Sequence, residues 1–176
     1  MKAGSESQTS RPLGAVNVNV NVNVDRQFRA RVQPEMLRRA ALATLAHQRI
    51  DRACDLAVVV TEDEVLRELN LRYRDVDAPT DVLAFPDETC EPFVSAPDRT
   101  DYLGDVILSF DRAEAQAAAS GHHVETELQL LVVHGVLHLL GYSDVTPEQR
   151  ARMWAAQAEI LRSLEGAVAE GDDTGL

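Results

Sequence analysis

The first third of the chain contains a strict alternation of valine and asparagine. From Val16 to Val24 the sequence reads VNVNVNVNV. A period of two places alternate side chains on opposite faces of a β-strand. The pattern therefore predicts a strand whose valines are buried and whose asparagines face away from the core. Since the asparagine face specifies register only weakly, we expect this strand at an edge of its sheet.

The rest of the chain alternates between short apolar runs and longer segments with helical periodicity. Pro34 is expected to open a helix that runs to about Arg52, and Thr61 with Glu64 forms a capping-box pattern for a helix through about Tyr73. The other predicted elements are strands at 56–60, 82–85 and 104–110 and helices at 111–120, 123–140 and 147–164. This order, β-α-β-α-β-β-α-α-α, predicts an α+β fold in which helices cover a four-stranded mixed β-sheet.

Length and composition fit a single domain. A chain of 176 residues, 45% of them hydrophobic, can bury one substantial core. We expect a disordered leader at 1–14, one domain at 15–164 and a disordered acidic tail at 165–176. The sequence contains neither the apolar core of a signal peptide nor an apolar run long enough for a membrane span. These features predict a cytoplasmic protein with no membrane partner.

Charge is distributed unevenly along the chain. The net charge of −12 argues against a nucleic-acid partner when the chain is taken as a whole. Residues 1–52, however, carry nine basic and four acidic side chains, a net of +5, which leaves −17 for the remainder. The first third could therefore face phosphates. A solvated basic helix explains the same charges, and both interpretations stay open.

The segment LLVVHGVLHLLGY carries the most informative polar residues. His134 and His138 are four residues apart, which places both imidazoles on one helix face with their Cβ atoms about 6 Å apart. Two ring nitrogens at this spacing can bind one metal ion. Because the neighbouring residues are apolar, the rings need either an ion or hydrogen-bond partners. Rings satisfied by backbone or carboxylate groups are the alternative that the spacing alone leaves open.

A third ligand is expected just after this helix. Gly141 ends the helix and turns the chain back, and Asp144 is the first downstream side chain able to reach the same ion. His134, His138 and Asp144 would leave one coordination position open, as catalytic sites do, and we expect one divalent ion per chain, zinc. A zincin protease needs glutamate directly after its first histidine, and Gly135 at that position excludes this class.

A metal hydrolase that acts on phosphodiesters would also need a cation to hold the scissile phosphate. Arg74 follows the predicted second helix. We expect Arg74 and His134 to be the catalytic residues, and Arg74 and Arg72 to be the substrate-binding residues. The planar guanidinium suits phosphate, although a contact with the helix dipole alone would explain either arginine. We expect the carboxylate of Asp105 to orient a ligand histidine. No nucleotide cofactor is expected.

Four segments together resemble one family. LNLRYRDVDAPTDVLAFP, LGDVILSFDRAEAQA, SGHHVETELQLLVVHGVLHLLGY and the helix that follows are similar to the YbeY family, the bacterial rRNA maturation endoribonucleases, over about residues 55–162. The resemblance implies a single-strand-specific, metal-dependent endoribonuclease in 16S rRNA 3′-end maturation and ribosome quality control. It implies ribosomal RNA and the small ribosomal subunit as partners. It also implies zinc on His134 and His138 and a phosphate-site arginine at Arg74.

One position departs from the family pattern. The family's third zinc histidine falls at Asp144, and no histidine follows His138. We expect Asp144 to act as the ligand instead, which would weaken the Lewis acidity of the ion and make Mn²⁺ or Mg²⁺ more competitive. Two alternatives remain. One is a non-catalytic ribosome-assembly factor that has lost full metal binding, and the other is a metal-dependent hydrolase of a different substrate.

Overall fold

The computed structural model describes residues 17–87 and 100–169 of the chain. The leader predicted at 1–14 and residues 170–176 of the predicted tail lie outside the described residues. In chain order the elements are β1 Val18–Val24, α1 Pro34–His47, β2 Cys54–Thr61, α2 Asp63–Arg74, β3 Val82–Pro86, β4 Asp101–Ser109, α3 Phe110–Ser120, α4 Val124–Leu139 and α5 Pro147–Ala169. This order confirms the predicted succession of strands and helices.

The four strands form one mixed sheet in the order β1-β2-β4-β3. β1 and β4 both run parallel to β2, whereas β3 runs antiparallel to β4. β1 lies at an edge, as its alternating sequence predicts. Val20 and Val24 are buried, and Asn19, Asn21 and Asn23 are exposed on the opposite face.

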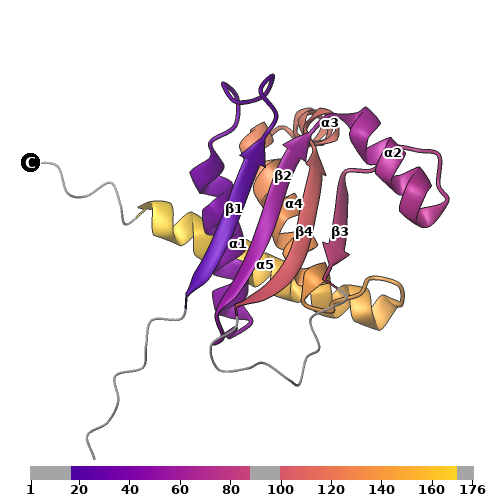
Figure 1. Ribbon diagram of the computed structural model, residues 1–176. Helices are drawn as coiled ribbons and strands as arrows, with labels where there is room; N and C mark the ends of the chain where they lie inside the picture. The colour runs from indigo at the N-terminus through magenta and orange to yellow at the C-terminus, as the bar shows by residue number, and fades with distance from the viewer. Residues whose placement is uncertain (1–16, 88–99, 170–176) are drawn as a thin grey trace, which may run out of the picture.

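Helices cover one face of the sheet (Figure 1). α1 contacts β1, α4 contacts β3 and β4, and α5 packs against both α1 and α4. The core between these layers is aliphatic, with Leu37 and Leu45 from α1, Val58 from β2 and Leu128 and Leu137 from α4 almost fully buried. Within the two described ranges, no helix combines the length and apolar character that crossing a bilayer requires. The fold is the predicted α+β domain, and it places α4 behind β3 and β4.

The predicted C-terminal ends of two helices are wrong. α1 ends at His47 rather than near Arg52, because Gln48 caps it and Arg49 adopts a left-handed backbone conformation with φ of 54°. α5 continues to Ala169, past the predicted end at 164. Neither feature has a strong local signal, since no glycine or proline marks the end of α1.

The capping box predicted at the start of α2 is also wrong. α2 begins at Asp63, and its N-cap is Glu62, whose side chain makes no capping hydrogen bond. The hydroxyl of Thr61 instead donates to the carboxylate of Asp25 at 2.5 Å. Thr61 is the last residue of β2, so its side chain joins two neighbouring strand ends rather than the helix.

Candidate metal centre

α4 places two histidines side by side at the surface of the core. Its apolar face is buried, with Leu131, Val132 and Val136 at most 3% exposed. His134 and His138 lie one turn apart, half-buried, and their Nε2 atoms are 3.1 Å apart. The predicted pairing of the two imidazoles on one helix face is therefore present.

The other nitrogen of each ring is held by a hydrogen bond. Nδ1–H of His138 donates to the backbone carbonyl of Tyr142 at 3.0 Å, and Nδ1–H of His134 donates to the amide oxygen of Gln157 at 3.2 Å. An oxygen of this kind only accepts, so each Nδ1 carries a proton, and in the neutral form of each ring the lone pair is on Nε2. Metal-binding histidines typically have this arrangement, in which a partner at one nitrogen orients the other.

Two lone pairs that face each other repel unless a positive charge lies between them. Nitrogens bound to one tetrahedral zinc ion at about 2.0–2.1 Å lie roughly 3.3 Å from each other. The observed separation of 3.1 Å between the Nε2 atoms is close to that value. The donor geometry therefore fits a shared metal ion.

Electrostatics keep one of these rings neutral. Burial lowers the pKa of His138 from its ordinary value, and the neighbouring His134 and Arg74 lower it further. The Tyr142 carbonyl and Asp144 act in the opposite direction and are outweighed. A neutral imidazole has the lone pair that a metal ion requires.

Asp144 completes a group of three possible ligands. α4 stops after Leu139, and the amide of Tyr142 bonds back to the carbonyl of Leu137 at 3.0 Å, which returns the chain toward the rings. The guanidinium of Arg150 holds the backbone carbonyl of Asp144 at 3.1 and 3.2 Å. Ligand atoms of His134, His138 and Asp144 all lie within 4.8 Å of one another. This half-buried cluster could hold a metal ion.

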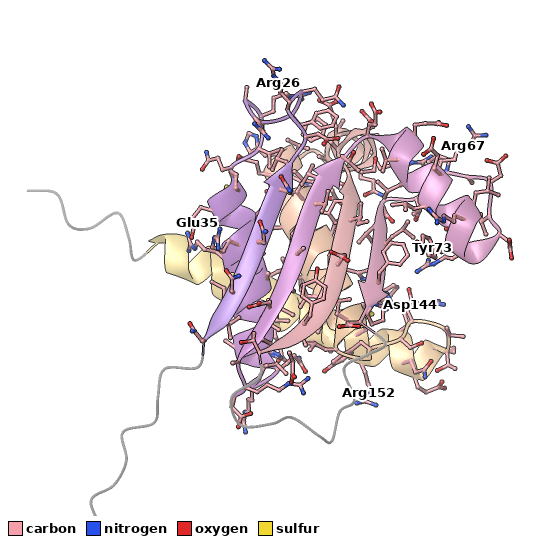
Figure 2. All side chains as sticks on the ribbon, viewed as in Figure 1. Arg26, Glu35, Arg67, Tyr73, Asp144 and Arg152 are labelled. Carbon is pink, nitrogen blue, oxygen red and sulfur yellow. The ribbon has the colours of Figure 1, made fainter. Side chains whose placement is uncertain are left out.

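The cluster forms one wall of a cleft of about 430 Å³. Arg74, the last residue of α2, lies at the cleft together with Thr80, Val82 and Val145. Figure 2 shows Asp144 below the end of α2, where Tyr73 marks the last turn. The loop between α2 and β3 therefore brings a guanidinium to the side chains that could bind a metal.

A family model described as endoribonuclease YbeY matches residues 19–165. The chain belongs to the YbeY family. Curated proteins named endoribonuclease YbeY are similar over most of the chain. The Chloroflexus aurantiacus protein is 46% identical over 74% of this chain and 86% of its own length. The Roseiflexus castenholzii protein is 44% identical over 78% and 87%, and a Dehalococcoides mccartyi protein is 43% identical over 78% and 91%.

The fold comparison agrees with this membership. A Thermotoga maritima protein solved in solution superposes with a TM-score of 0.57 over 89% of this chain and 99% of its own. The two sequences are 22% identical, so this likeness supports the fold alone. Membership of the YbeY family supports a nuclease role in RNA processing.

Close packing between α4 and the sheet explains why residue 135 is a glycine. A Cβ atom at Gly135 would lie 2.4 Å from Cγ1 of Val106 in β4 and 3.2 Å from Cγ2 of Val82 in β3. No side chain fits between α4 and the sheet at this point. The glycine that excludes the zincin mechanism thus allows α4, and with it both histidines, to approach the strands closely.

The structure separates the two arginines predicted to bind substrate. Arg74 lines the cleft, and its charge is near enough to lower the pKa of His138. Arg72 is exposed and lies over the ring of Tyr73, 5.5 Å from its centroid, outside the cleft lining. Of this pair, only Arg74 is in the lining of the cleft.

The expected role of Asp105 is wrong. Its carboxylate accepts a hydrogen bond from the hydroxyl of Tyr102 at 2.7 Å. Val106, the next residue in β4, points to α4, so Asp105 points to the opposite face of the sheet. The ring nitrogens that Asp105 was expected to orient are held by Gln157 and the Tyr142 carbonyl.

Gln157 is the residue beside the histidine pair that the sequence did not reveal. It lies on α5, 23 residues after the histidine that it orients. Its position four residues after the buried Met153 and three before the buried Ile160 indicates a helix face turned toward the core. A polar residue at such a position is the only local signal, and it does not name the partner.

Proposed function

We propose that this chain is a metal-dependent endoribonuclease that cleaves single-stranded RNA. Family membership supports the nuclease class, and the cleft supports the chemistry, because it combines possible metal ligands with an arginine. We further propose 16S rRNA 3′-end maturation and ribosome quality control as the role, with the small ribosomal subunit as partner. The excess of basic residues in the first third of the chain supports an RNA partner.

One observation supports the proposal that the site needs a metal ion. The two Nε2 atoms face each other at 3.1 Å while both Nδ1 atoms are committed to oxygen acceptors. In this state neither Nε2 can donate a hydrogen bond to the other. Holding two such lone pairs face to face in a half-buried site without a cation is unfavourable, since polar groups withdrawn from water need partners. A bound cation removes this cost.

The proposed ligands are His134, His138 and Asp144, with zinc as the expected ion. When bound there, a divalent ion supplies Lewis acidity to a phosphodiester oxygen or to water. Two imidazoles and one carboxylate leave positions open for substrate. The carboxylate adds negative charge that a third imidazole would not, so oxygen-preferring ions compete better than they would at an all-histidine site.

Arg74 would hold the scissile phosphate from the opposite side of the cleft. Its guanidinium can donate two parallel hydrogen bonds to phosphate oxygens and offset charge that develops there during cleavage. Gln157 and the Tyr142 carbonyl keep the imidazoles in the required tautomer, so the site needs little rearrangement on binding. These residues act before and during cleavage as binding and positioning groups.

The direct test measures metal content and RNA cleavage in the same preparations. The purified protein should contain one divalent ion per chain, and chelation should abolish cleavage of single-stranded ribosomal RNA. His134→Ala should lose both the ion and cleavage. Cleavage that survives chelation would show a different mechanism or a contaminating nuclease.

Asp144 is tested by two substitutions. Asp144→Ala should lower metal content, and unchanged stoichiometry would rule Asp144 out as a ligand. Asp144→His exchanges the carboxylate for an imidazole and should shift competition between Zn²⁺ and Mn²⁺ toward Zn²⁺. A wild-type protein that binds the small subunit but neither binds metal nor cleaves RNA would instead be the assembly factor.

A further inference from the structure

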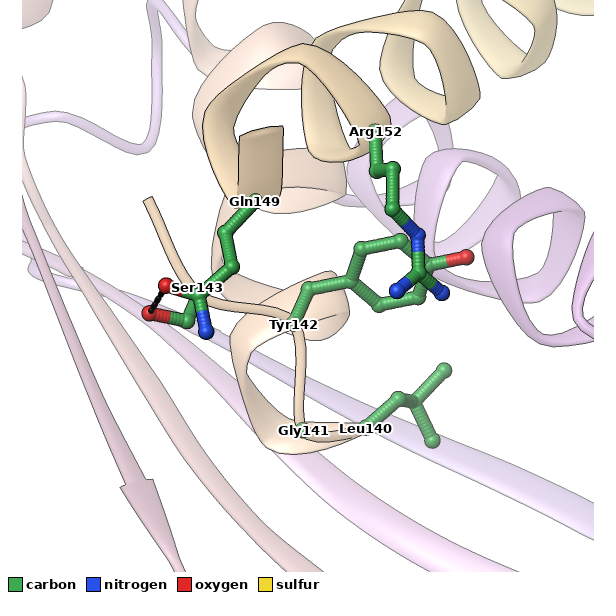
Figure 3. A pocket seen from close by; sticks show the side chains of 6 residues that line it. All are labelled: Leu140, Gly141, Tyr142, Ser143, Gln149 and Arg152. Carbon is green, nitrogen blue, oxygen red and sulfur yellow. Dashed lines mark hydrogen bonds between the residues drawn. The ribbon is translucent and has the colours of Figure 1, made fainter. Parts of the chain in front are cut away.

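A second hollow adjoins the proposed metal cleft on the far side of the turn that follows α4. It has a volume of about 220 Å³ and is lined by Leu140, Gly141, Tyr142, Ser143, Gln149 and Arg152 (Figure 3). Tyr142 and Ser143 line both this hollow and the cleft. The two cavities are therefore neighbours that share one stretch of chain.

The polar side chains of this hollow offer hydrogen-bond donors. The amide oxygen of Gln149 accepts from the hydroxyl of Ser143 and from the backbone amide of Thr146, each at 3.2 Å. Its amide nitrogen has no partner among residues 17–87 and 100–169. Over those same ranges, the guanidinium of Arg152 makes no ion pair or hydrogen bond. An exposed guanidinium with no ion pair, next to an amide N–H group, can bind an anion.

The floor of the hollow is held in place. The hydroxyl of Tyr142 donates to the side-chain oxygen of Gln48 at 3.0 Å, which ties the ring to the end of α1. Figure 3 shows the Gln149 amide beside Ser143, and in this view the Arg152 guanidinium overlaps the hydroxyl end of the Tyr142 ring. A half-buried aromatic surface in the same hollow as these two donor groups suits a phosphate that is attached to a sugar.

The volume of the hollow and the charge of the chain favour a phosphate within a polymer over a free small molecule as the ligand. A volume of about 220 Å³ corresponds to roughly seven waters and is below the ~300–1,000 Å³ typical of small-molecule pockets. Beyond residue 52 the chain carries a net charge of −17, which disfavours capture of free anions from solution. A phosphate tethered to a strand already held in the cleft arrives at high effective concentration and overcomes this disadvantage.

We propose that this hollow is a backbone subsite, in which Arg152 and Gln149 bind a phosphate of the same RNA strand that occupies the metal cleft. The inference rests on the proposed function and deepens it, because it extends the substrate contact beyond the scissile phosphate. Single strands can follow such a bend around residues 142 and 143, whereas a stiff duplex cannot, so the subsite also favours unpaired RNA.

The test compares Arg152→Gln with Arg162→Gln. Both arginines are exposed on α5, and Arg162 does not line the hollow, so it controls for the loss of one positive charge. Binding of single-stranded RNA oligonucleotides of increasing length is measured by fluorescence anisotropy over a range of salt concentrations, with chelator present to keep the RNA intact. Inorganic phosphate alone is titrated in parallel.

Arg152→Gln should weaken binding of long oligonucleotides about tenfold, the usual scale for losing one charged donor. The slope of log affinity against log salt should fall by about 0.7, the value for one phosphate of a single strand. Oligonucleotides too short to leave the cleft, and Arg162→Gln throughout, should behave as wild type.

Three results would overturn the subsite. They are equal affinity and slope for Arg152→Gln and wild type, an equal loss in Arg162→Gln, and binding of inorganic phosphate that depends on Arg152 while RNA binding does not. If wild-type protein cleaves RNA and loses cleavage on chelation, any of these results leaves the proposed function intact. Absence of both RNA binding and cleavage in the wild type would overturn both proposals.

Discussion

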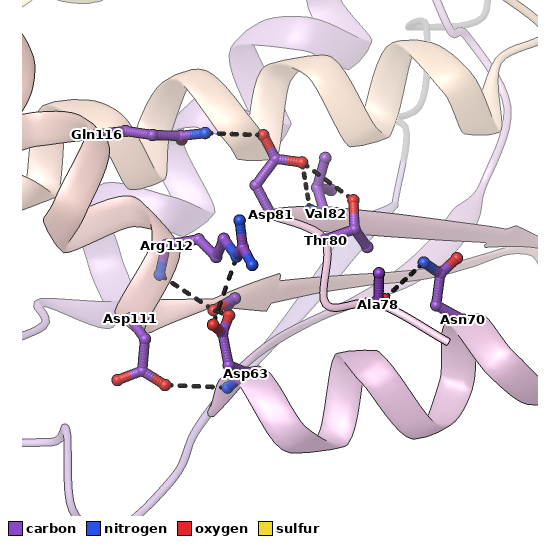
Figure 4. A network of polar contacts seen from close by, with 10 residues as sticks. Asp63, Asn70, Ala78, Thr80, Asp81, Val82, Asp111, Arg112 and Gln116 are labelled. Atoms are coloured by element: carbon purple, nitrogen blue, oxygen red, sulfur yellow. Dashed lines mark hydrogen bonds and ion pairs between the residues drawn. The ribbon is translucent and has the colours of Figure 1, made fainter. Parts of the chain in front are cut away.

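Two polar clusters beside the sheet differ in how their hydrogen-bond donors and acceptors are matched. One, in Figure 4, joins the starts of α2 and α3. There the hydroxyl of Ser109 donates to Asp63 at 2.5 Å and accepts from the amide of Arg112 at 3.1 Å, and Asp63 also lies 3.4 Å from the guanidinium of Arg112. The amide of Asp63 donates to Asp111 at 2.9 Å. Each of these acceptors meets a donor or a positive charge, although Oε1 of Gln116 in the same network has no hydrogen-bond partner among the described residues.

The cleft beside α4 lacks this complementarity. His134, His138 and Asp144 present lone pairs to one another, and their hydrogen-bond partners satisfy only the outer atoms of the two rings. The first cluster can stabilise the fold by itself, whereas the second has the ligand atoms that we propose bind a cation. The contrast separates polar residues that serve folding from those that serve binding.

The largest effect should come from removing the positively charged side chain of Arg74 from the cleft. Arg74→Gln should lower kcat/KM about 10²–10³-fold, as loss of a charge-stabilising donor usually does. Metal content and thermal stability should stay at the wild-type level, because Arg74 is exposed. Arg72→Gln, one position from Tyr73 but outside the cleft, should change kcat/KM only slightly. Comparable losses in both variants would contradict the assignment of Arg74.

The next effect concerns the group that orients His134. Gln157→Leu removes the acceptor for Nδ1–H, so metal affinity should fall about 10–100-fold, as expected for outer partners of metal ligands. Gln157→Glu keeps an acceptor and should retain most of the affinity. Isothermal titration of the metal-free variants with Zn²⁺ measures both. Equal affinities for leucine and glutamate at this position would show that the hydrogen bond has no role.

A substitution in the cluster around Ser109 and Asp63 should change the stability of the protein and not its metal binding. Ser109→Ala removes the N-cap of α3 and a partner of Asp63, and should cost about 0.5–2 kcal/mol. The melting temperature should then fall by roughly 2–4 °C per kcal/mol. Zinc affinity of the folded protein should not change. A loss of zinc affinity would mean that the two clusters are coupled.

The smallest effect is a pH dependence of the metal-free protein. Burial, and next the neighbouring His134, lower the pKa of His138 below 6.5 in the folded state. The unfolded chain therefore takes up this proton at higher pH than the folded protein does. As the pH falls from about 6.5 toward the lowered folded pKa, the free energy of unfolding should decrease.

This contribution can be isolated by substitution. His138→Asn should flatten the pH dependence of unfolding below 6.5 in the absence of metal, whereas His123→Asn, exposed at the start of α4, should not. Urea titrations over this pH window give the result. A dependence that persists in His138→Asn would assign it to another group.

Patterns within one element were sufficient for much of the fold and for the core of the site. The alternation in β1 predicted its buried and exposed faces, and the spacing of His134 and His138 predicted their shared helix face. The turn at Gly141 predicted that Asp144 would return toward the rings, because its length leaves few paths. Each of these inferences depends on neighbours within a few residues.

Features that depend on packing between distant elements could not be predicted in this way. Nothing near Gln157 in the sequence indicates that α5 would place it against His134. Asp105 was assigned to the wrong face because the strand pattern does not say which side α4 covers. Thr61 has the spacing of a capping residue, yet the end of β1 lies close enough for Asp25 to bind it instead.

The central claim is tested most directly by a crystal structure of the protein grown with zinc and measured at the zinc absorption edge. We predict one anomalous peak per chain in the cleft, about 2.0–2.1 Å from Nε2 of His134 and of His138 and about 2.0–2.2 Å from a carboxylate oxygen of Asp144. A cleft without a peak in ample zinc, with the imidazoles bonded only to protein groups, would contradict the metal centre.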